Sequence, residues 1–297
     1  MGNKILYAIV YSWAKIHALL PMRILYILSD ILYFLIYYVI GYRIKVVRKN
    51  LSDSFPEKTD IELRRLERRF YHHFADYIVE TIKLAHISLS ELQQRGFIVN
   101  PEVLNDLLDK GHSCCMLLMG HYGNWEWLSG STTRLKDCRM YQIYRPLNNQ
   151  AIDKLFIYLR TKFGSFGIKK NDTLRDIIAL KREGIRSLVI FLADQTPSPS
   201  NLHYWTTWLN QDTPMLTGPE RIARKLNIPV IYLDVRQLRR GYYDATLQII
   251  SENPKDTPEF WITEQYARMM ERSILRDPAY YLWTHKRWKH KKRHICS

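Results

Sequence analysis

The chain has 297 residues, enough for one large domain or two small ones, each with a substantial buried core. Its 44 Lys and Arg against 29 Asp and Glu give a net charge of +15, which favours nucleic acid, an anionic membrane or a phosphorylated substrate as a partner. No RNA- or DNA-binding signature accompanies the charge, and the 20 Tyr, 8 Trp and 10 Phe favour a membrane interface over nucleic acid.

The four cysteines indicate a reducing compartment. Cys114 and Cys115 are adjacent within an apolar run, Cys138 is isolated, and Cys296 lies near the C-terminus. This arrangement matches neither a disulfide framework nor the ligand spacing of a zinc site.

Two apolar segments open the chain. Residues 5–20 place apolar side chains at near-helical spacing, which predicts an amphipathic helix that either lies in a bilayer interface or docks on the protein core. Residues 24–42 carry a single charge, Asp30, and as a helix they reach about 28 Å, just short of a hydrocarbon core of about 30 Å. Asp30 and five tyrosines weaken the case for a deep span. We therefore expect membrane-anchoring helices over residues 1–45 that either span once or lie in one leaflet, with a cytoplasmic flank slightly favoured by the basic residues that follow.

A long helix is predicted next. Thr59 and Glu62 form a capping box, in which each side chain satisfies an amide at the helix start, and the helix should run over about residues 59–85. Its four arginines form either a solvated face or a contact with lipid headgroups: Arg64, Arg65, Arg68 and Arg69.

After residue 111 the chain alternates strand-like and helical segments. The strand-like runs are 139–144, 186–193, 229–235 and 243–250, and the helical ones are 150–163, 172–183, 217–227 and 260–276. Such alternation predicts an α/β fold with a mixed, mainly parallel sheet flanked by helices. The last two strands are separated by a short turn that contains Gly241, so we expect an antiparallel hairpin at the sheet edge.

One stretch between these segments has the pattern of a ligand site. Residues 113–119 predict a buried strand, and His121 would follow its carboxyl end, where open α/β sheets bind their ligands. Gly123 can adopt a positive φ and Asn124 is a good N-cap, so a helix should begin at the next residue with Glu126 in its first turn.

The two titratable residues of this stretch are five positions apart. On one helix they would point about 140° apart, but across a strand, a turn and a helix start His121 and Glu126 can meet. A carboxylate on one imidazole nitrogen fixes the tautomer and makes the other nitrogen a general base. The alternative is a hydrogen-bonded loop histidine without a catalytic role. His86 and Glu91 have the same spacing in a helical context, so spacing alone does not decide.

The chain ends in a basic stretch, residues 286–293, next to Trp283 and Trp288. It is either a solvated tail or a patch that holds anionic lipid.

Six motifs, in chain order, resemble a known family. The sequence H-Y-G-N-W-E at 121–126 resembles the H-x4-D/E motif of the lysophospholipid (glycerolipid) acyltransferase superfamily, and the surrounding sequence resembles the bacterial late acyltransferases of lipid A biosynthesis. The other shared blocks are R-K-N-L-S-D-S-F-P-E at 48–57, Y-R-P-L-N-N at 144–149, L-A-D-Q at 192–195, T-G-P-E-R-I-A-R-K-L at 217–226 and Y-L-W-T-H-K-R-W-K at 281–289. One departure, at residues 204–210, replaces a Phe-Phe-Gly-type stretch and affects the acyl-chain pocket and the acceptor.

The resemblance implies a membrane-bound acyltransferase whose catalytic domain covers residues 46–297. It would move a fatty acyl chain from acyl carrier protein to a hydroxyl of a lipid A precursor at the cytoplasmic face of the bacterial inner membrane. His121 would be the general base and Glu126 would orient and polarise it. No metal or bound cofactor is expected, because a thioester is already activated.

The resemblance also suggests substrate-binding residues. Amides near Gly123 and Asn124, or the guanidinium of Arg145, would stabilise the oxyanion, or Arg145 would hold an acceptor phosphate. Asp194 and Gln195, at the same expected sheet edge, would order Arg145 or the acceptor. The shared Y-R-P-L-N-N block adds Asn148. Two alternatives stay open, an acyltransferase for a lysophospholipid or aminolipid and a non-catalytic basic protein that binds lipid or nucleic acid.

Overall fold

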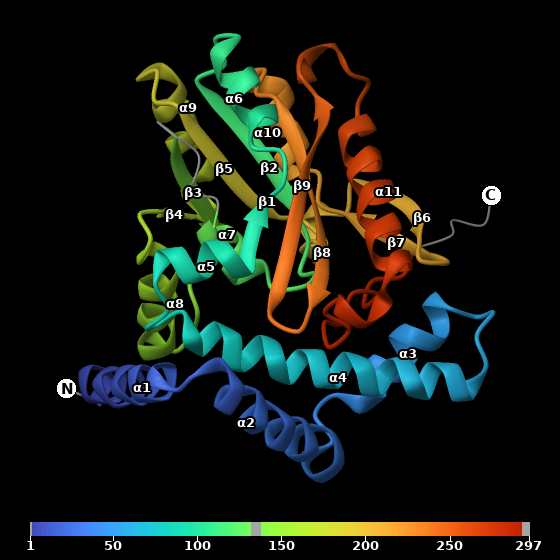
Figure 1. Cartoon of the computed structure of the whole chain (residues 1–297). Coiled ribbons are helices and arrows are strands. Elements are labelled where there is room, and N and C mark those ends of the chain that lie inside the picture. Colours follow the sequence, from blue (N-terminus) through green and yellow to red (C-terminus); the bar gives the residue numbers. More distant parts are fainter. Residues whose placement is uncertain (1, 132–137, 293–297) are drawn as a thin grey trace.

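The computed structural model describes residues 2–131 and 138–292 and confirms the expected α/β fold (Figure 1). A seven-stranded sheet has the order β1-β9-β8-β2-β5-β3-β4, and β6 and β7 form a separate hairpin. Five strands of the sheet, β2, β3, β4, β5 and β8, are parallel, whereas β9 pairs antiparallel with β8, and β1 is parallel to β9. The strands are β1 Gly96–Ile98, β2 Cys114–Met119, β3 Arg139–Tyr144, β4 Phe166–Lys169, β5 Ser187–Leu192, β6 Tyr204–Trp208, β7 Gln211–Met215, β8 Val230–Arg239 and β9 Tyr242–Ser251.

The helices follow the predicted segments closely. The expected helix over 59–85 is α4, whose capping box of Thr59 and Glu62 is present, with the Thr59 amide donating to the Glu62 carboxylate at 2.8 Å. The α-helices are α1 Gly2–Leu19, α2 Met22–Phe34, α3 Ile44–Ser54, α4 Asp60–Lys83, α5 Leu89–Arg95, α6 Glu102–Asp109, α7 Trp125–Ser131, α8 Gln150–Thr161, α9 Thr173–Arg182, α10 Gly218–Leu226 and α11 Trp261–Arg276. A π-helical segment, η1 Leu35–Ile40, continues α2, and a short 3-10 turn, η6 Pro278–Tyr280, follows α11.

The centre of the sheet is β2, whose sequence C-C-M-L-L-M is apolar throughout. All six of its residues are buried, and the strand pairs with β5 on one side and β8 on the other. A strand covered on both faces has a continuous apolar run rather than an alternating one. The residues that follow β2 therefore leave the sheet from its buried centre.

The predicted antiparallel hairpin is confirmed as β8 and β9. Its predicted place at the sheet edge is wrong, because the short strand β1 pairs with the outer side of β9. The hairpin of β6 and β7 is not signalled by the sequence, because its residues mix aromatic, Thr, Asp and Pro side chains without a clear alternation. It packs on α11, where the indole of Trp208 donates to the Ala267 carbonyl at 3.1 Å. The departure at 204–210 thus lies largely in this hairpin.

The N-terminal helices lie along the lower edge of the molecule in Figure 1, beneath α4. α1 packs on α4 and α8, and α2 packs on α4. The continuous helix Met22–Ile40 is long and apolar enough to cross a membrane by length and composition. A separate anchoring function for residues 1–45 stays a prediction.

Candidate active site

The carboxyl ends of β2 and β5 bring together His121 and Asp194. The two strands are in register, with Met119 opposite Leu192, and each side chain follows two residues later. The Nδ1 atom of His121 lies 2.7 Å from Oδ1 of Asp194. The carboxyl group is buried, whereas 14% of the His121 side chain is exposed.

The charge of Asp194 determines which nitrogen of His121 carries the proton. Burial alone would raise the pKa of the Asp194 carboxyl, but the His121 ring and nearby backbone amides together hold it below its ordinary value. An ionised carboxylate at Nδ1 favours the tautomer with the proton on that nitrogen and leaves a lone pair on Nε2. This is the arrangement of a general base.

Gln195 lies on the other side of the ring. Its Nε2 atom is 3.2 Å from Nε2 of His121, and the residue is half-buried. The amide can donate a hydrogen bond to the lone pair that Asp194 leaves on His121. The structure therefore brings His121, Asp194 and Gln195 into one cluster.

Glu126 makes a different contact from the one its spacing predicts. Its carboxylate accepts two hydrogen bonds from Arg160 of α8, from Nε at 2.9 Å and from Nη2 at 2.5 Å. Burial opposes the charge of Arg160, but Glu126 holds the pKa of the guanidinium above its ordinary value. The carboxylate that contacts His121 is thus Asp194, and Glu126 joins α7 to α8 by a bidentate ion pair.

The turn between His121 and α7 has the predicted local structure. Gly123 has a φ of 61°, and a Cβ at this position would meet Val235 Cγ1 at 3.0 Å. Asn124 is fully buried and its Oδ1 accepts the Trp127 amide at 3.0 Å, as an N-cap does. The Gly123 amide donates to the Tyr280 carbonyl at 3.0 Å. The Gly123 amide is therefore already paired within the protein, and oxyanion stabilisation by other amides near Gly123 and Asn124 stays a prediction.

A buried glutamate of α4 holds this turn in place. Oε2 of Glu80 accepts hydrogen bonds from Asn124 Nδ2 at 2.7 Å and from the Tyr243 hydroxyl at 2.9 Å. Oε1 accepts from the Tyr26 hydroxyl of α2 at 2.9 Å. Glu80 is fully buried, so these three donors replace water around its carboxyl group. The network connects α2, α4 and β9 to the residue that caps α7.

The ionisation of Glu80 gives a testable pH dependence. Burial raises the pKa of Glu80 to about 7, whereas an unfolded Glu titrates at about 4.3. The group's contribution to stability is therefore present below about pH 4.3 and is lost as the pH rises through about 7. We expect the free energy of unfolding, measured in urea, to fall more steeply over this range for the wild type than for Glu80→Gln. Parallel pH profiles would show that Glu80 is not the group responsible.

Two other predicted substrate-binding residues come from the segment after β3. Arg145 and Asn148 follow β3 and are exposed. Because β3 pairs with β5, Arg145 leaves the sheet at the same edge as Asp194. The observed side-chain partner of Asp194 is His121, and the expectation that Asp194 and Gln195 order Arg145 or the acceptor stays a prediction.

The C-terminal segment supplies contacts that the sequence reading missed. The Leu282 amide donates to the His121 carbonyl at 3.1 Å, and the Thr196 amide to His285 Nε2 at 3.3 Å. Burial lowers the pKa of His285 to about 4, which keeps this ring neutral. Arg287 is fully buried and donates to the Pro214 carbonyl at 2.7 Å, so at least this part of the basic stretch is neither solvated nor free to hold lipid. Residue 293 lies outside the described residues.

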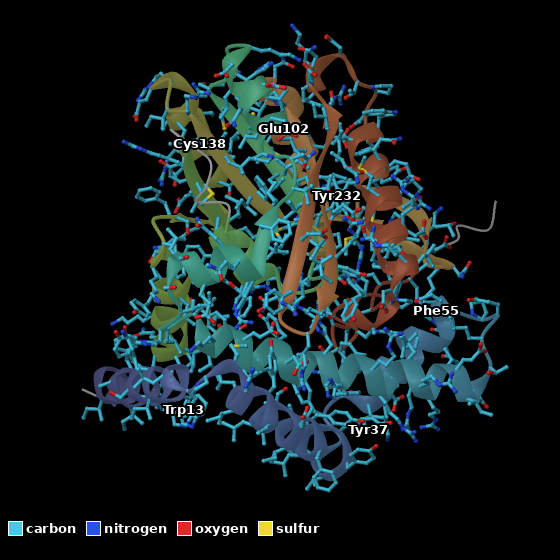
Figure 2. The ribbon with its side chains drawn as sticks, in the orientation of Figure 1. Trp13, Tyr37, Phe55, Glu102, Cys138 and Tyr232 are labelled. Atoms are coloured by element: carbon cyan, nitrogen blue, oxygen red, sulfur yellow. The ribbon has the colours of Figure 1, made fainter. Side chains whose placement is uncertain are left out.

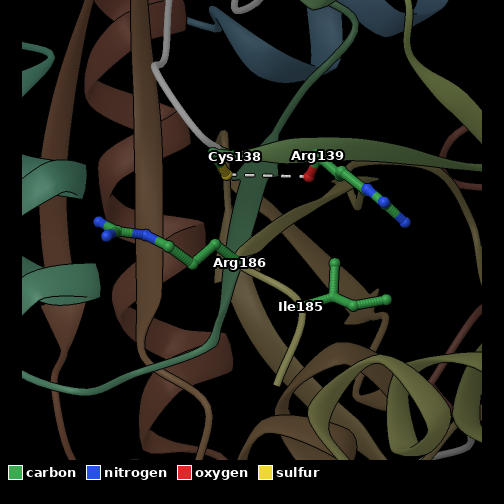
Figure 3. A pocket seen from close by; sticks show the side chains of 4 residues that line it. All are labelled: Cys138, Arg139, Ile185 and Arg186. Carbon is green, nitrogen blue, oxygen red and sulfur yellow. Dashed lines mark hydrogen bonds between the residues drawn. The ribbon is translucent and has the colours of Figure 1, made fainter. Parts of the chain in front are cut away.

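A pocket of about 490 Å³ lies at the other end of the sheet (Figure 3). Its lining includes Cys138, Arg139, Ile185 and Arg186, which precede or begin β3 and β5. Since His121 and Asp194 follow the carboxyl ends of their strands, this pocket is separate from their cluster.

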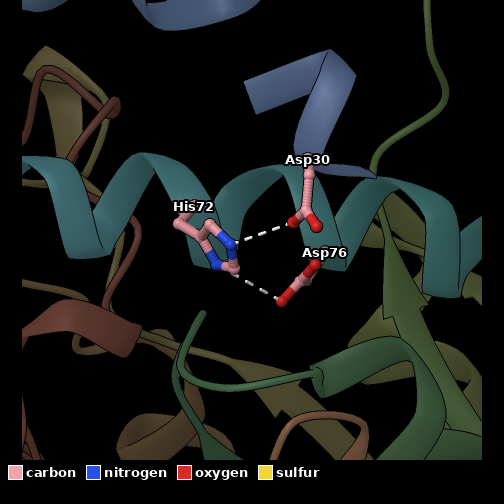
Figure 4. Close-up of side chains that lie close together, drawn as sticks. All are labelled: Asp30, His72 and Asp76. Atoms are coloured by element: carbon pink, nitrogen blue, oxygen red, sulfur yellow. Dashed lines mark ion pairs between the residues drawn. The ribbon is translucent and has the colours of Figure 1, made fainter. Parts of the chain in front are cut away.

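Asp30, His72 and Asp76 form the one cluster in the described ranges 2–131 and 138–292 whose spacing could hold a metal ion (Figure 4). Arg240 already binds both carboxylates, with Nη2 at 2.6 Å from Asp30 Oδ1 and at 2.6 Å from Asp76 Oδ1. A guanidinium thus fills the position of a cation, and the cluster is explained as a link between α2, α4 and the β8–β9 hairpin.

Comparison with known proteins and protein families identifies the family of this chain. No curated protein matches the chain in sequence. A family model described as bacterial lipid A biosynthesis acyltransferase matches residues 3–290, which include the N-terminal helices, the His121 cluster and the C-terminal segment around it. The match covers far more than half of the chain. This protein therefore belongs to the bacterial lipid A biosynthesis acyltransferase family.

Proposed function

We propose that the protein is a membrane-bound O-acyltransferase that moves a fatty acyl chain from the thioester of acyl carrier protein to a hydroxyl of a lipid A precursor. The family supports acyl transfer in lipid A biosynthesis in general. The observation that supports the chemistry is the contact between His121 and Asp194 at 2.7 Å, at the sheet edge where α/β proteins bind ligands. We place the reaction at the cytoplasmic face of the bacterial inner membrane, with residues 1–45 as the anchor and 46–297 as the catalytic domain.

In this mechanism the acceptor hydroxyl takes the place of the Gln195 amide at His121 Nε2. The ring removes the hydroxyl proton while the oxygen attacks the thioester carbon, and Asp194 stabilises the imidazolium that forms. The tetrahedral intermediate then expels the thiolate of the donor, which takes the proton back from His121. The products are an ester and a free thiol, so the step consumes no other reactant.

Glu126 has a positioning role in this proposal rather than the orienting role that its spacing predicts. Its ion pair with Arg160 fixes the first turn of α7 against α8. Because α7 follows the His121 turn directly, this pair supports the geometry of the base from one side, and Glu80 supports it from the other.

The net charge of +15 supports two anionic partners, the acidic carrier protein and a phosphorylated glycolipid. The family match favours this acceptor class over a lysophospholipid or aminolipid, and it favours an enzyme over a non-catalytic binding protein. The test is mass spectrometry of lipid A from cells with and without the protein. We expect lipid A that lacks one acyl chain when the protein is absent, and unchanged lipid A contradicts the proposed acceptor.

Arg145 is the remaining candidate for holding the oxyanion or an acceptor phosphate. It is exposed at the sheet edge beside β5, and a bidentate grip requires the planar guanidinium. We expect Arg145→Lys to lower kcat/KM about tenfold or more, because lysine keeps the charge and loses the paired donors. A raised KM with unchanged kcat assigns phosphate binding, and an equal fall in kcat and kcat/KM assigns oxyanion stabilisation. Unaltered kinetics remove Arg145 from the site.

A further inference from the structure

The outer surfaces of α1, α2 and η1 are unusually apolar for exposed helices. The first 42 residues hold sixteen of the 27 large apolar side chains that are exposed in the part of the chain the structure describes. We call their shared surface the apolar face; it includes Ile9, Trp13, Ile16, Ile27, Ile31 and Val39, each at least 49% exposed. Figure 2 shows Trp13 at this lower edge of the molecule. A contiguous face of this kind marks an interaction surface.

The opposite side of α2 and η1 is bound to the catalytic domain by polar contacts. Three hydroxyl groups donate to carboxylates of α4, namely Tyr26 to Glu80 at 2.9 Å, Ser29 to Asp76 at 2.6 Å and Tyr37 to Glu67 at 2.7 Å. Tyr26 and Tyr37 are eleven positions apart, about 16 Å along the helix. The segment is therefore attached along most of its length and not only at its end.

These contacts decide how the segment can meet a bilayer. If residues 22–40 crossed the membrane while attached to α4, the carboxylates of Glu67, Asp76 and Glu80 would enter the hydrocarbon, where ionisable groups are strongly disfavoured. If the segment detached, those buried carboxylates would lose their hydroxyl partners. A helix that keeps its polar side on the protein can offer only its outer side to lipid.

The charge beside the apolar face matches an anionic membrane surface. Residues 1–45 contain five Lys or Arg and one acidic residue. Arg68 of α4 lies against the Tyr37 hydroxyl, where η1 meets α4, and Arg64 is exposed one turn before it. Both line a pocket of about 500 Å³ along α4. Apolar side chains next to arginines suit a leaflet with anionic headgroups, whereas a second copy of this basic surface would be repelled.

We propose that α1, α2 and η1 lie in the plane of the membrane and insert the apolar face into one leaflet of an anionic bilayer, with Arg64 and Arg68 at the level of the headgroups. The proposal rests on the membrane residence within the proposed function and is independent of the acyl transfer reaction.

The proposal also accounts for the position of the site. The Trp125 ring lies next to the His121 cluster and stacks on Tyr77 of α4, with 4.1 Å between the ring centroids. A single layer, the helix α4, therefore lies between the cluster and the N-terminal helices (Figure 1).

The depth of the helices in a bilayer tests the proposal directly. Spin labels would be placed on cysteines substituted for Ile24, Ile31 and Val39, all on the exposed side, in a full-length protein with Cys138 and Cys296 changed to serine. Depth would be measured by power saturation in vesicles of phosphatidylglycerol and phosphatidylcholine. We expect the same shallow depth of about 5–10 Å at all three positions. A gradient with Ile31 near the bilayer centre and the other two near opposite surfaces overturns the proposal in favour of a span, and absence of vesicle binding also overturns it.

Matched variants test which side chains contact the lipid vesicles. The double variant Ile27→Glu and Ile31→Glu should weaken vesicle binding more than about tenfold, because two apolar side chains no longer enter the leaflet. Ile178→Glu on α9, an exposed apolar residue at the other end of the molecule, should have no effect. Arg64→Ala and Arg68→Ala should each weaken binding to phosphatidylglycerol vesicles about fivefold and leave binding to pure phosphatidylcholine unchanged.

Arg175→Ala, also exposed but on α9, is the charge control and should bind both kinds of vesicle normally. If the Ile27 and Ile31 variant binds like the wild type, the apolar face does not contact lipid. Vesicle binding and depth are measured without donor or acceptor. Their failure is therefore distinguishable from a failure of the proposed reaction.

Discussion

Replacing His121 with alanine is expected to lower the rate of acyl transfer by about 10²–10⁴-fold while the fold survives. The size is that of losing a positioned general base. The ring lies at the surface of the cluster with 14% of its side chain exposed, so its removal leaves no large cavity in the core. The measurement is the initial rate of transfer from acyl carrier protein to a purified lipid A precursor, with a melting curve to show that the variant is folded.

His86 is the control for this experiment. It has the same five-residue spacing to a glutamate, but it is exposed after α4, and the glutamate at that spacing, Glu91, binds Arg95 at 2.9 Å. His86→Ala should retain the wild-type rate. An equal loss of rate in a folded His86→Ala protein would mean that removal of a histidine acts through something other than the base.

The second large effect is expected from Asp194→Asn, and it distinguishes the role of Asp194 from that of Glu126. Asp194→Asn keeps the shape but removes the charge at His121 Nδ1, which disfavours the required tautomer. A comparable change in a serine protease triad costs about 10⁴-fold in kcat, so we expect a loss of about 10³–10⁴-fold with little change in stability. Steady-state kinetics should place this loss in kcat rather than in KM.

Glu126→Gln should behave differently because its partner is Arg160. Removing one member of a buried ion pair typically costs about 3–5 kcal/mol, and since 27% of the Arg160 side chain is exposed we expect up to about 3 kcal/mol here. Activity should fall less than in Asp194→Asn, and the melting temperature should fall more. If Glu126→Gln instead matches His121→Ala in rate with a native melting curve, then Glu126 acts on the base as its spacing predicts.

Local structure at the site could be predicted from sequence because it depends on neighbours in the chain. The strand before His121 follows from an uninterrupted apolar run, and the turn follows from Gly123 and the capping preference of Asn124. The start of α4 follows in the same way from Thr59 and Glu62. Each of these features is set within about six residues.

The partners of the site residues could not be predicted, because they depend on which elements become neighbours. Asp194 reaches His121 across 73 residues only because β5 pairs with β2 in the observed register. Arg160 reaches Glu126 because α8 packs beside α7. Arg287 is buried within a stretch of similar basic residues, and composition does not show which of them docks into the core.

The most direct test of the central claim is acyl transfer by the purified protein. Wild-type protein would be mixed with an acyl carrier protein thioester and a lipid A precursor in detergent micelles, and the lipid would be analysed by mass spectrometry while released thiol is counted. We predict a precursor heavier by one ester-linked acyl chain, one thiol released for each chain transferred, and almost no product with His121→Ala. Absence of the acylated product with folded wild-type protein, or an equal yield with His121→Ala, would contradict the account.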